Sequence, residues 1–331
     1  LTEQVLLELF GEELPRLTVD FAPALGPGLE RLSPEARHTF HTAWRLRSVR
    51  LASTIALPAV ASGAMMLAIV FYSGALEVLS LGRARPLLGV ADALALDAIV
   101  VMPDGDDGFY LDSPLAIDYD QCLASGAGLF GPTPSRDATC VRSRRYETYV
   151  VHDLVGWIDG RYRTLARRDG RALAGLSMGG FGATALALRH PDEFAAAASH
   201  SGAIALLYRG PHPFAPGKAE LITDLAGWAQ TGGPISAWIA GLVGDLPRMK
   251  AYDLVELARA VGPGKVALYL DCGTEDDFRL HDNAQYAHEA LTAAHVEHAF
   301  FLGPGKHDFA FWSARVPASL AFLRDHTARP E

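Results

Sequence analysis

Cysteine is scarce in this sequence, which excludes two classes of protein. Only Cys122, Cys140 and Cys272 occur among 331 residues, and none stands in a CxxC pair or at zinc-type spacing from histidine. Three thiols are too few for a disulfide scaffold, and structural zinc sites need closely spaced ligands. We therefore expect no metal and no cofactor. Pairing of Cys122 with Cys140 depends on whether the protein is exported.

Basic residues are in deficit. There are 29 Lys and Arg against 38 Asp and Glu, a net charge of −9. This balance argues against nucleic acid or an anionic membrane as a partner. The short basic run of Arg142, Arg144 and Arg145 is interpreted as a solvated approach to a helix rather than an anion site.

Charge is absent from Leu51–Leu76, a stretch long enough to span a bilayer. Pro58 and the Ser62-Gly63 pair divide it into two short apolar runs. Turn-forming residues at these positions favour two buried strands joined by a turn. We expect no membrane span here.

The chain is long enough for one large core, since half of its residues are hydrophobic. Apolar runs alternate with helical patterns after about residue 48, which is typical of a mostly parallel sheet with helices on both faces. We expect a helical extension over 1–48 and a catalytic domain over 49–331. The Gly-, Pro- and Trp-rich segment 203–262 is expected to form a cap-like insertion.

The expected strands are short apolar runs bounded by Gly, Pro or Asp. They lie at 50–59, 65–72, 97–103, 171–177, 194–202, 265–271 and 298–303. The expected helices lie between and after them, at 146–161, 178–189, 281–294 and 309–325. The appearance of chemistry-bearing residues directly after several of these strands is what points to function.

A nucleophile motif follows one of these strands. Gly175-Leu176-Ser177-Met178-Gly179 is a G-x-S-x-G pattern between an apolar strand and a helix. The bare pattern arises easily by chance, but strand, sharp turn and helix are the setting in which it lifts a serine above the sheet. The alternative is a glycine-rich turn with an incidental serine.

An acid and a base are available after later strands. The loop after 265–271 carries Glu275, Asp276 and Asp277, and physical reasoning alone does not choose among the three. The loop after 298–303 carries His307, just before a helix. Acid and histidine following the serine is the order of an α/β-hydrolase triad. His200, at another strand end, is the nearest competitor for the base.

These segments resemble a known group, the esterase D-like branch of the α/β hydrolases, over roughly residues 50 to 325. That branch includes S-formylglutathione hydrolases, tributyrin-type esterases and mycolyltransferases. The motifs that carry the resemblance are MPDG with a following aromatic, RYETYVVHDLVGWIDGRYRT, AGLSMGGFGA, RHPDEFAAAASHSGA, CGTEDDF and GKHDFAFW. The resemblance implies an α/β-hydrolase fold with Ser177 as nucleophile, Asp276 as acid and His307 as base.

The resemblance also implies an oxyanion hole. One donor would be the backbone N–H of Met178, after the nucleophile. The second would be the N–H of Ala75, in the turn Tyr72-Ser73-Gly74-Ala75. Here the sequence departs from the family, because Ser73 stands where His or Asp is usual.

The function that follows is hydrolysis of short-acyl esters or thioesters through an acyl-serine intermediate, with a small-molecule ester as the partner. The alternatives are an acyltransferase of mycolyltransferase type, a non-catalytic binding module with this fold, and a serine peptidase. We expect a cytoplasmic location, or secretion if an upstream signal segment has been removed. A homo-oligomer is left open.

Overall fold

The computed structural model describes residues 98–103, 105, 107–115 and 144–328, together with the strand backbones at 50–53 and 66–71. The expected extension at 1–48, and with it Ala75, Cys122 and Cys140, lie outside the described residues. Within the described part of the chain, no helix has the length and apolar character needed to cross a membrane.

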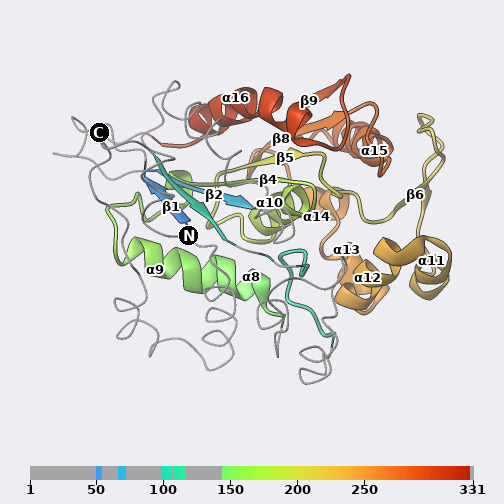
Figure 1. The fold of residues 1–331 in the computed structure, drawn as a ribbon, viewed down its shortest axis with the longest axis horizontal. Helices are drawn as coiled ribbons and strands as arrows, with labels where there is room; N and C mark the ends of the chain where they lie inside the picture. The colour runs from blue at the N-terminus through green and yellow to red at the C-terminus, as the bar shows by residue number, and fades with distance from the viewer. Residues whose placement is uncertain are drawn as a thin grey trace, which may run out of the picture.

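A seven-stranded sheet forms the centre of the fold (Figure 1). Its strands are β1 (Arg50–Ser53), β2 (Met66–Phe71), β3 (Ala98–Met102), β4 (Arg171–Leu176), β5 (Ala196–His200), β8 (Ala267–Gly273) and β9 (His298–Gly303). Their order is β1-β3-β2-β4-β5-β8-β9, and every pairing except β1 with β3 is parallel. Six of these strands lie within the predicted runs, and β8 extends two residues past the end of its run. The predicted α/β architecture is confirmed.

The pairing of two strands in this sheet goes beyond what the sequence predicted. The two strands of the 51–76 stretch both form, but β3 lies between them in the sheet. Strands joined by a tight turn pair with each other as antiparallel neighbours. Here β2 pairs with β3 and β4, so β1 and β2 are not neighbours, and the turn expected between them lies outside the described residues.

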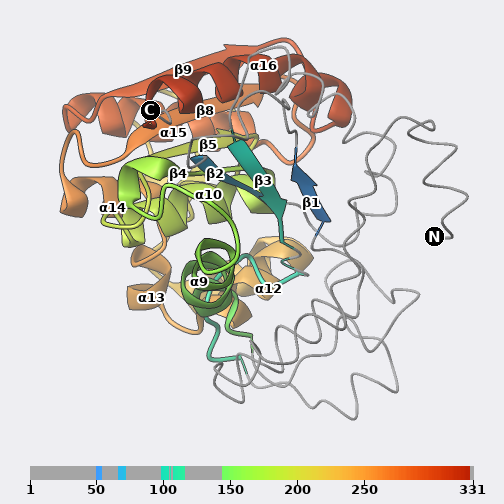
Figure 2. The ribbon, with the colours of Figure 1, turned by 90° about the vertical axis from the view of Figure 1, so that its left-hand side faces the viewer.

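Helices cover both faces of the sheet (Figure 2). They are α8 (Tyr146–Thr148) continuing through a π-helical segment (Tyr149–Leu154) into α9 (Val155–Asp159), α10 (Met178–Arg189), α14 (Leu254–Val261), α15 (Leu280–Ala293) and α16 (Phe309–Asp325), with a short 3-10 turn at Arg168–Gly170. The predicted helices at 146–161, 178–189, 281–294 and 309–325 match these bounds within two residues.

The two faces of the sheet differ in side-chain size. One face packs residues such as Leu173 and Leu268 into the large core beneath α8–α10, α14 and α15. The other presents alanines of β4 and β5 to Leu320 and Leu323 of α16. Small side chains let a helix approach a sheet closely, because nothing beyond Cβ separates the two backbones. The close packing of α16 against β5 follows from this.

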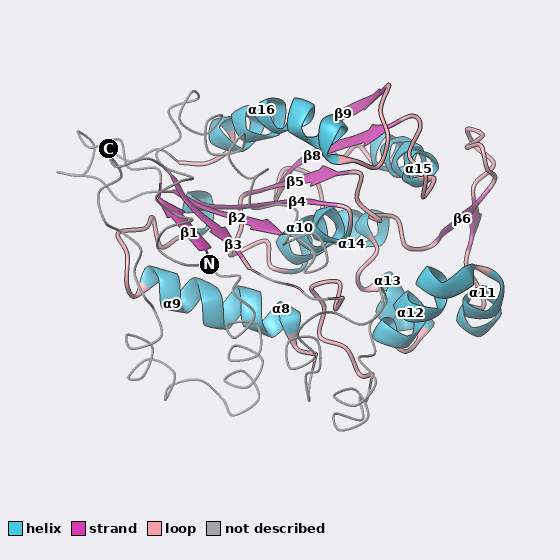
Figure 3. Cartoon of the chain, in the orientation of Figure 1, coloured by secondary structure: helices cyan, strands magenta, loops and turns pink. Residues whose placement is uncertain are grey.

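The segment between β5 and β8 holds further elements (Figure 3). They are β6 (Tyr208–Gly210), β7 (Glu220–Leu221), α11 (Leu225–Thr231), α12 (Gly233–Val243) and α13 (Leu246–Lys250). Several of their side chains, including Leu242 and Met249, join the main core. The segment is therefore anchored to the domain, and its role as a cap stays a prediction.

Candidate active site

Strand register brings the ends of three strands to one edge. Leu176 of β4 pairs with His200 of β5, and His200 pairs with Asp271 of β8. Parallel strands that end together place the residues that follow them side by side, and ligands of open α/β sheets bind at this edge. Ser177 and the loop containing Asp276 both follow strands at this edge.

Ser177 occupies a strained turn between β4 and α10. Its φ of 52° and ψ of −120° lie in a region that residues with a Cβ rarely adopt. The turn closes tightly, because a Cβ on Gly175 would lie 2.2 Å from the carbonyl oxygen of Gly179. The Ser177 N–H donates to the carbonyl of His200 at 2.8 Å, which secures the turn to β5. This is the geometry of a nucleophile elbow.

His307 and Asp276 complete a chain of contacts to this serine. His307 Nε2 lies 2.9 Å from Ser177 Oγ, and His307 Nδ1 lies 2.7 Å from Asp276 Oδ2. The other carboxylate oxygen, Oδ1, accepts from the backbone N–H groups of Phe278 at 2.9 Å and Leu280 at 3.3 Å. The Asp276 side chain is fully buried, so its orientation is fixed from both oxygens.

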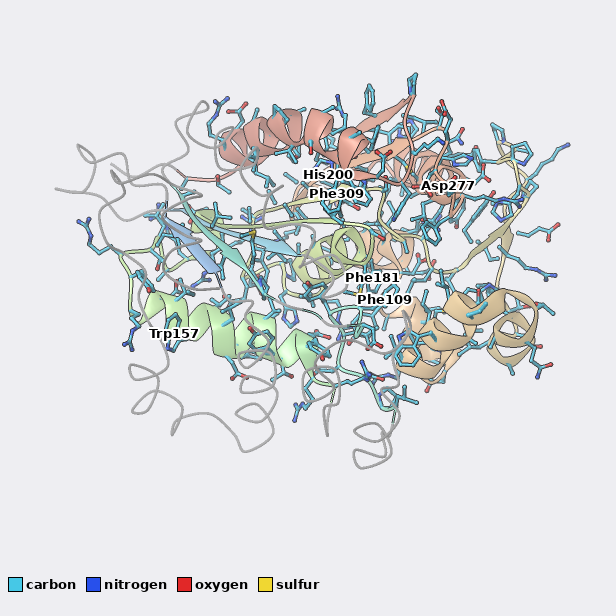
Figure 4. The ribbon with its side chains drawn as sticks, viewed as in Figure 1. Phe109, Trp157, Phe181, His200, Asp277 and Phe309 are labelled. Carbon is cyan, nitrogen blue, oxygen red and sulfur yellow. The ribbon has the colours of Figure 1, made fainter. Side chains whose placement is uncertain are left out.

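The neighbouring acids do not share this position. Glu275 and Asp277 are exposed, whereas Asp276 is buried beneath the histidine (Figure 4 labels Asp277). The sequence left open which of the three carboxylates acts with the histidine. The three differ in the direction of their side chains within one loop. Only Asp276 contacts His307 among them.

The imidazole of His307 lies between two aromatic rings. Trp312 of α16 contacts it edge-to-face, with centroids 5.0 Å apart, and Phe278 does so at 4.7 Å. Trp312 also donates its indole N–H to Ser201 Oγ at 3.2 Å. Neither ring was singled out from the sequence as a neighbour of the base, although both stand in the motifs CGTEDDF and GKHDFAFW.

Cys272 lies next to the acid and is not a competing nucleophile. Burial raises the pKa of its thiol, and the adjacent carboxylate of Asp276 raises that pKa further. The thiol is placed to donate to Asp276 Oδ2, 3.7 Å away. A protonated, buried thiol is unreactive, so Cys272 supports Asp276 instead.

His200, the competing histidine, belongs to a second Ser-His-Asp set. Its Nδ1 lies 2.9 Å from both carboxylate oxygens of Asp271, and its Nε2 lies 2.9 Å from Ser319 Oγ. All three residues are buried between the sheet and α16, and Arg315 adds a bond to Asp271 at 3.3 Å. Figure 4 shows His200 within the layer beneath α16. No substrate reaches a serine in that position.

Met178 is the first residue of α10, directly after the nucleophile. Backbone N–H groups in the first turn of a helix have no acceptor within that helix, and the helix dipole favours negative charge there. Its N–H is thus suited to an oxyanion. The second expected donor, Ala75, lies outside the described residues.

One sequence interpretation near the site is wrong. Arg144 is not solvated: it is almost fully buried and forms an ion pair with Asp107. The Trp238 indole N–H of α12 donates to the Asp107 carbonyl at 2.9 Å, and Arg144 lies over the Trp238 ring. Arg145 matches the expectation, with nearly half of its side chain exposed, and Arg142 lies outside the described residues. A buried arginine persists because a carboxylate pairs with it.

The same loop after β3 is packed beneath the nucleophile helix. Phe109 contacts Phe181 of α10 edge-to-face at 5.7 Å (Figure 4), and the Tyr110 hydroxyl donates to the Pro103 carbonyl at 3.1 Å. The aromatic residues that follow the MPDG segment therefore support α10. In the part of the chain that the structure describes, no group of three or more His, Cys, Asp or Glu residues is arranged to hold a metal ion.

Known proteins share this fold. An S-formylglutathione hydrolase from Agrobacterium tumefaciens superposes with a TM-score of 0.55 at 17% identity, covering 82% of this chain and 87% of that chain. MPT51 (FbpC1) of Mycobacterium tuberculosis gives 0.54 at 16% identity, covering 81% and 91%. FphF, a fluorophosphonate-binding serine hydrolase of Staphylococcus aureus, gives 0.53 at 19%, covering 82% and 86%. The fold therefore places the chain in the α/β-hydrolase class.

Sequence relationship defines the family within that class. The family described as "Putative esterase" matches residues 50–323, and the chain belongs to it. Esterase Rv1288 of Mycobacterium tuberculosis is 36% identical over 125 residues, which is 38% of this chain. The chain spans only 23% of the length of that relative, and the same holds for Esterase MT1326.

Proposed function

We propose that this protein is a serine carboxylesterase that hydrolyses short-acyl esters or thioesters through an acyl intermediate on Ser177. The observation that carries the proposal is the series of contacts from Asp276 through His307 to Ser177, at 2.7 and 2.9 Å. Both separations are within hydrogen-bond reach, which proton transfer between a nucleophile and its base requires.

In the acylation half-reaction, Ser177 Oγ attacks the carbonyl carbon while His307 Nε2 takes its proton. Asp276 holds the imidazole tautomer and stabilises the cation that forms. The negative charge on the former carbonyl oxygen is received by the backbone N–H groups of Met178 and Ala75. Collapse of this intermediate breaks the bond to the leaving group, which takes the proton from His307.

Deacylation repeats the sequence with water. His307 removes a proton from the water molecule, whose oxygen attacks the acyl carbon, and the proton then returns to Ser177 Oγ as the acid departs. No step needs a metal or a cofactor. The side chains that carry out the chemistry are those of three residues.

Transfer to an alcohol uses the same intermediate and is the alternative outcome. It would require an acceptor site walled by apolar side chains. Trp238 of the 203–262 insertion donates a hydrogen bond to the Asp107 carbonyl and lies against Arg144. These contacts favour a packing role for Trp238 over a role in lining an acceptor site. Hydrolysis is therefore the reaction we propose.

The test is a chain-length series of p-nitrophenyl esters with the wild type and Ser177→Ala. We expect turnover of short acyl chains by the wild type and none above background by the variant. Absence of turnover for every ester contradicts the enzyme assignment, and equal turnover by the variant contradicts the site. Adding an alcohol and measuring transfer product separates hydrolysis from transfer.

A further inference from the structure

Phe278 is a large apolar side chain exposed at the candidate active site. It is 53% exposed, more than Phe301 or Leu221, the other exposed large hydrophobic side chains of the described residues. It stands between Asp277 and Arg279, which are also exposed. Single exposed apolar residues are common on protein surfaces, so its exposure alone carries no meaning. Its position relative to the base is what distinguishes it.

The acid of the triad fixes that position. The Phe278 backbone N–H donates to Asp276 Oδ1 at 2.9 Å, while Asp276 Oδ2 lies 2.7 Å from His307 Nδ1. The Phe278 ring then meets the imidazole of His307 at 4.7 Å between centroids and 69° between planes. One carboxylate thus orients both the base and the backbone that carries the ring.

Of the two rings beside the imidazole, only Phe278 is open to a substrate. Trp312, at 5.0 Å from His307, is 3% exposed and its indole N–H is bonded to Ser201. Half of the Phe278 side chain faces solvent. A molecule held close to His307 Nε2 can therefore contact the Phe278 ring and not Trp312.

The chemistry identifies which part of a substrate is held there. In acylation, a bond forms between Ser177 Oγ and the acyl carbon, and the bond from that carbon to the leaving oxygen or sulfur breaks. The serine proton passes through His307 Nε2 to the leaving atom, which must come within hydrogen-bond distance of Nε2. The substituent on the leaving atom is thereby brought next to the imidazole and its neighbours. Water has no such substituent when it takes this place in deacylation.

We propose that Phe278 forms an apolar wall of the leaving-group subsite and favours esters of aromatic or extended apolar alcohols and thiols over esters of small alcohols. This inference rests on the proposed function and adds its substrate class. Aromatic groups that meet edge-to-face or offset gain binding free energy beyond that of simple burial. The wall acts on acylation alone, because the leaving group has departed before water attacks.

The test compares benzyl acetate with ethyl acetate, which share one acyl group and have leaving alcohols of similar basicity. For Phe278→Ala we expect kcat/KM for benzyl acetate to fall about 10-fold, and that for ethyl acetate to change less than about 3-fold. The deacylation rate of the common acetyl-enzyme, measured by rapid quench, stays the same. Phe278→Tyr, which keeps the ring, restores the benzyl preference.

The matched control is Phe301→Ala, which removes another exposed phenylalanine, one whose ring lies against Arg315. We expect it to leave the benzyl-to-ethyl ratio unchanged. Equal losses for both acetates in Phe278→Ala, with slower deacylation, contradict the inference, because they show a ring that only supports His307. A wild type that hydrolyses neither acetate contradicts the proposed function itself.

Discussion

His200 Nε2 lies 2.9 Å from Ser319 Oγ, the same separation as that of His307 Nε2 from Ser177 Oγ. The two Ser-His-Asp sets differ in their surroundings. Ser319 is 1% exposed, and its hydroxyl also lies 3.0 Å from the Val316 carbonyl within its own helix. Ser177 is partly exposed at a strained turn. Accessibility and backbone geometry, not the hydrogen bonds alone, separate the site from the structural network.

Ser319→Ala is therefore expected to spare activity and lower stability. The change leaves the buried His200 Nε2 without its partner, at a cost of about 1–3 kcal/mol in the free energy of unfolding. Urea unfolding and p-nitrophenyl acetate turnover measure the two effects. Loss of turnover in a variant of normal stability would contradict the account, because it would show that Ser319 takes part in the reaction.

The acid is tested by paired amide substitutions in one loop. In Asp276→Asn the neutral amide cannot stabilise the imidazolium or hold the same tautomer, and kcat is expected to fall about 10³- to 10⁴-fold. Asp277→Asn changes an exposed neighbour and is expected to alter kcat less than about 3-fold. Steady-state kinetics at pH 7 with circular dichroism as a folding control gives the comparison. Similar kcat for both variants would remove Asp276 from the triad.

Glu147 makes stability depend on pH. Burial raises its pKa, but hydrogen bonds from His190, Tyr252 and Arg189 outweigh this and lower the pKa from 4.5 to about 2. A pKa below that of the unfolded chain stabilises the fold above about pH 4.5, and this contribution is lost as the pH falls toward 2.

Wild type should therefore exceed Glu147→Gln in unfolding free energy by on the order of 2–3 kcal/mol at pH 7. The difference shrinks as the pH falls from about 4.5 toward 2. Urea unfolding of both proteins between those limits and neutrality measures it. A difference that is constant with pH would show that Glu147 contributes no titrating interaction.

Substitution of Gly175 tests the turn at the nucleophile, and substitution of Gly156 is its control. Gly175→Ala places a Cβ 2.2 Å from a carbonyl oxygen of α10, so we expect loss of esterase turnover and a destabilisation of about 2 kcal/mol or more. Gly156→Ala, in α9, meets nothing within 4 Å and is expected to stabilise the protein by about 0.5–1 kcal/mol. Thermal unfolding and turnover separate the pair. Full activity in Gly175→Ala would contradict a tightly closed elbow.

The strands were predictable because short apolar runs flanked by Gly, Pro or Asp are typical of strands buried on both faces. The major helices were predictable from the helical patterns between these runs. Strand pairing was less so: the two strands within 51–76 were predicted, but composition does not say that β3 lies between them in the sheet. Arg144 was misjudged for a related reason. Its partner Asp107 is 37 residues away in the sequence, and local charge patterns do not reveal such pairs.

Much of the candidate site could be located from motif order, since serine, acid and histidine each follow a strand. Choosing Asp276 over its neighbours required the family resemblance, because side-chain direction within a loop is set by contacts such as those with Phe278 and Leu280. The role of His200 could not be predicted. It depends on the register of β5 against β8 and on where α16 lies over them.

The central claim is that Ser177 carries the acyl group, and the most direct measurement is labelling with a fluorophosphonate probe followed by peptide mass spectrometry. Such a probe phosphonylates an activated serine and leaves a stable adduct. The account predicts one phosphonyl group per chain, located on Ser177, with esterase turnover lost in proportion to labelling. A wild-type protein that hydrolyses esters but carries the label on another residue, or carries none, would contradict it.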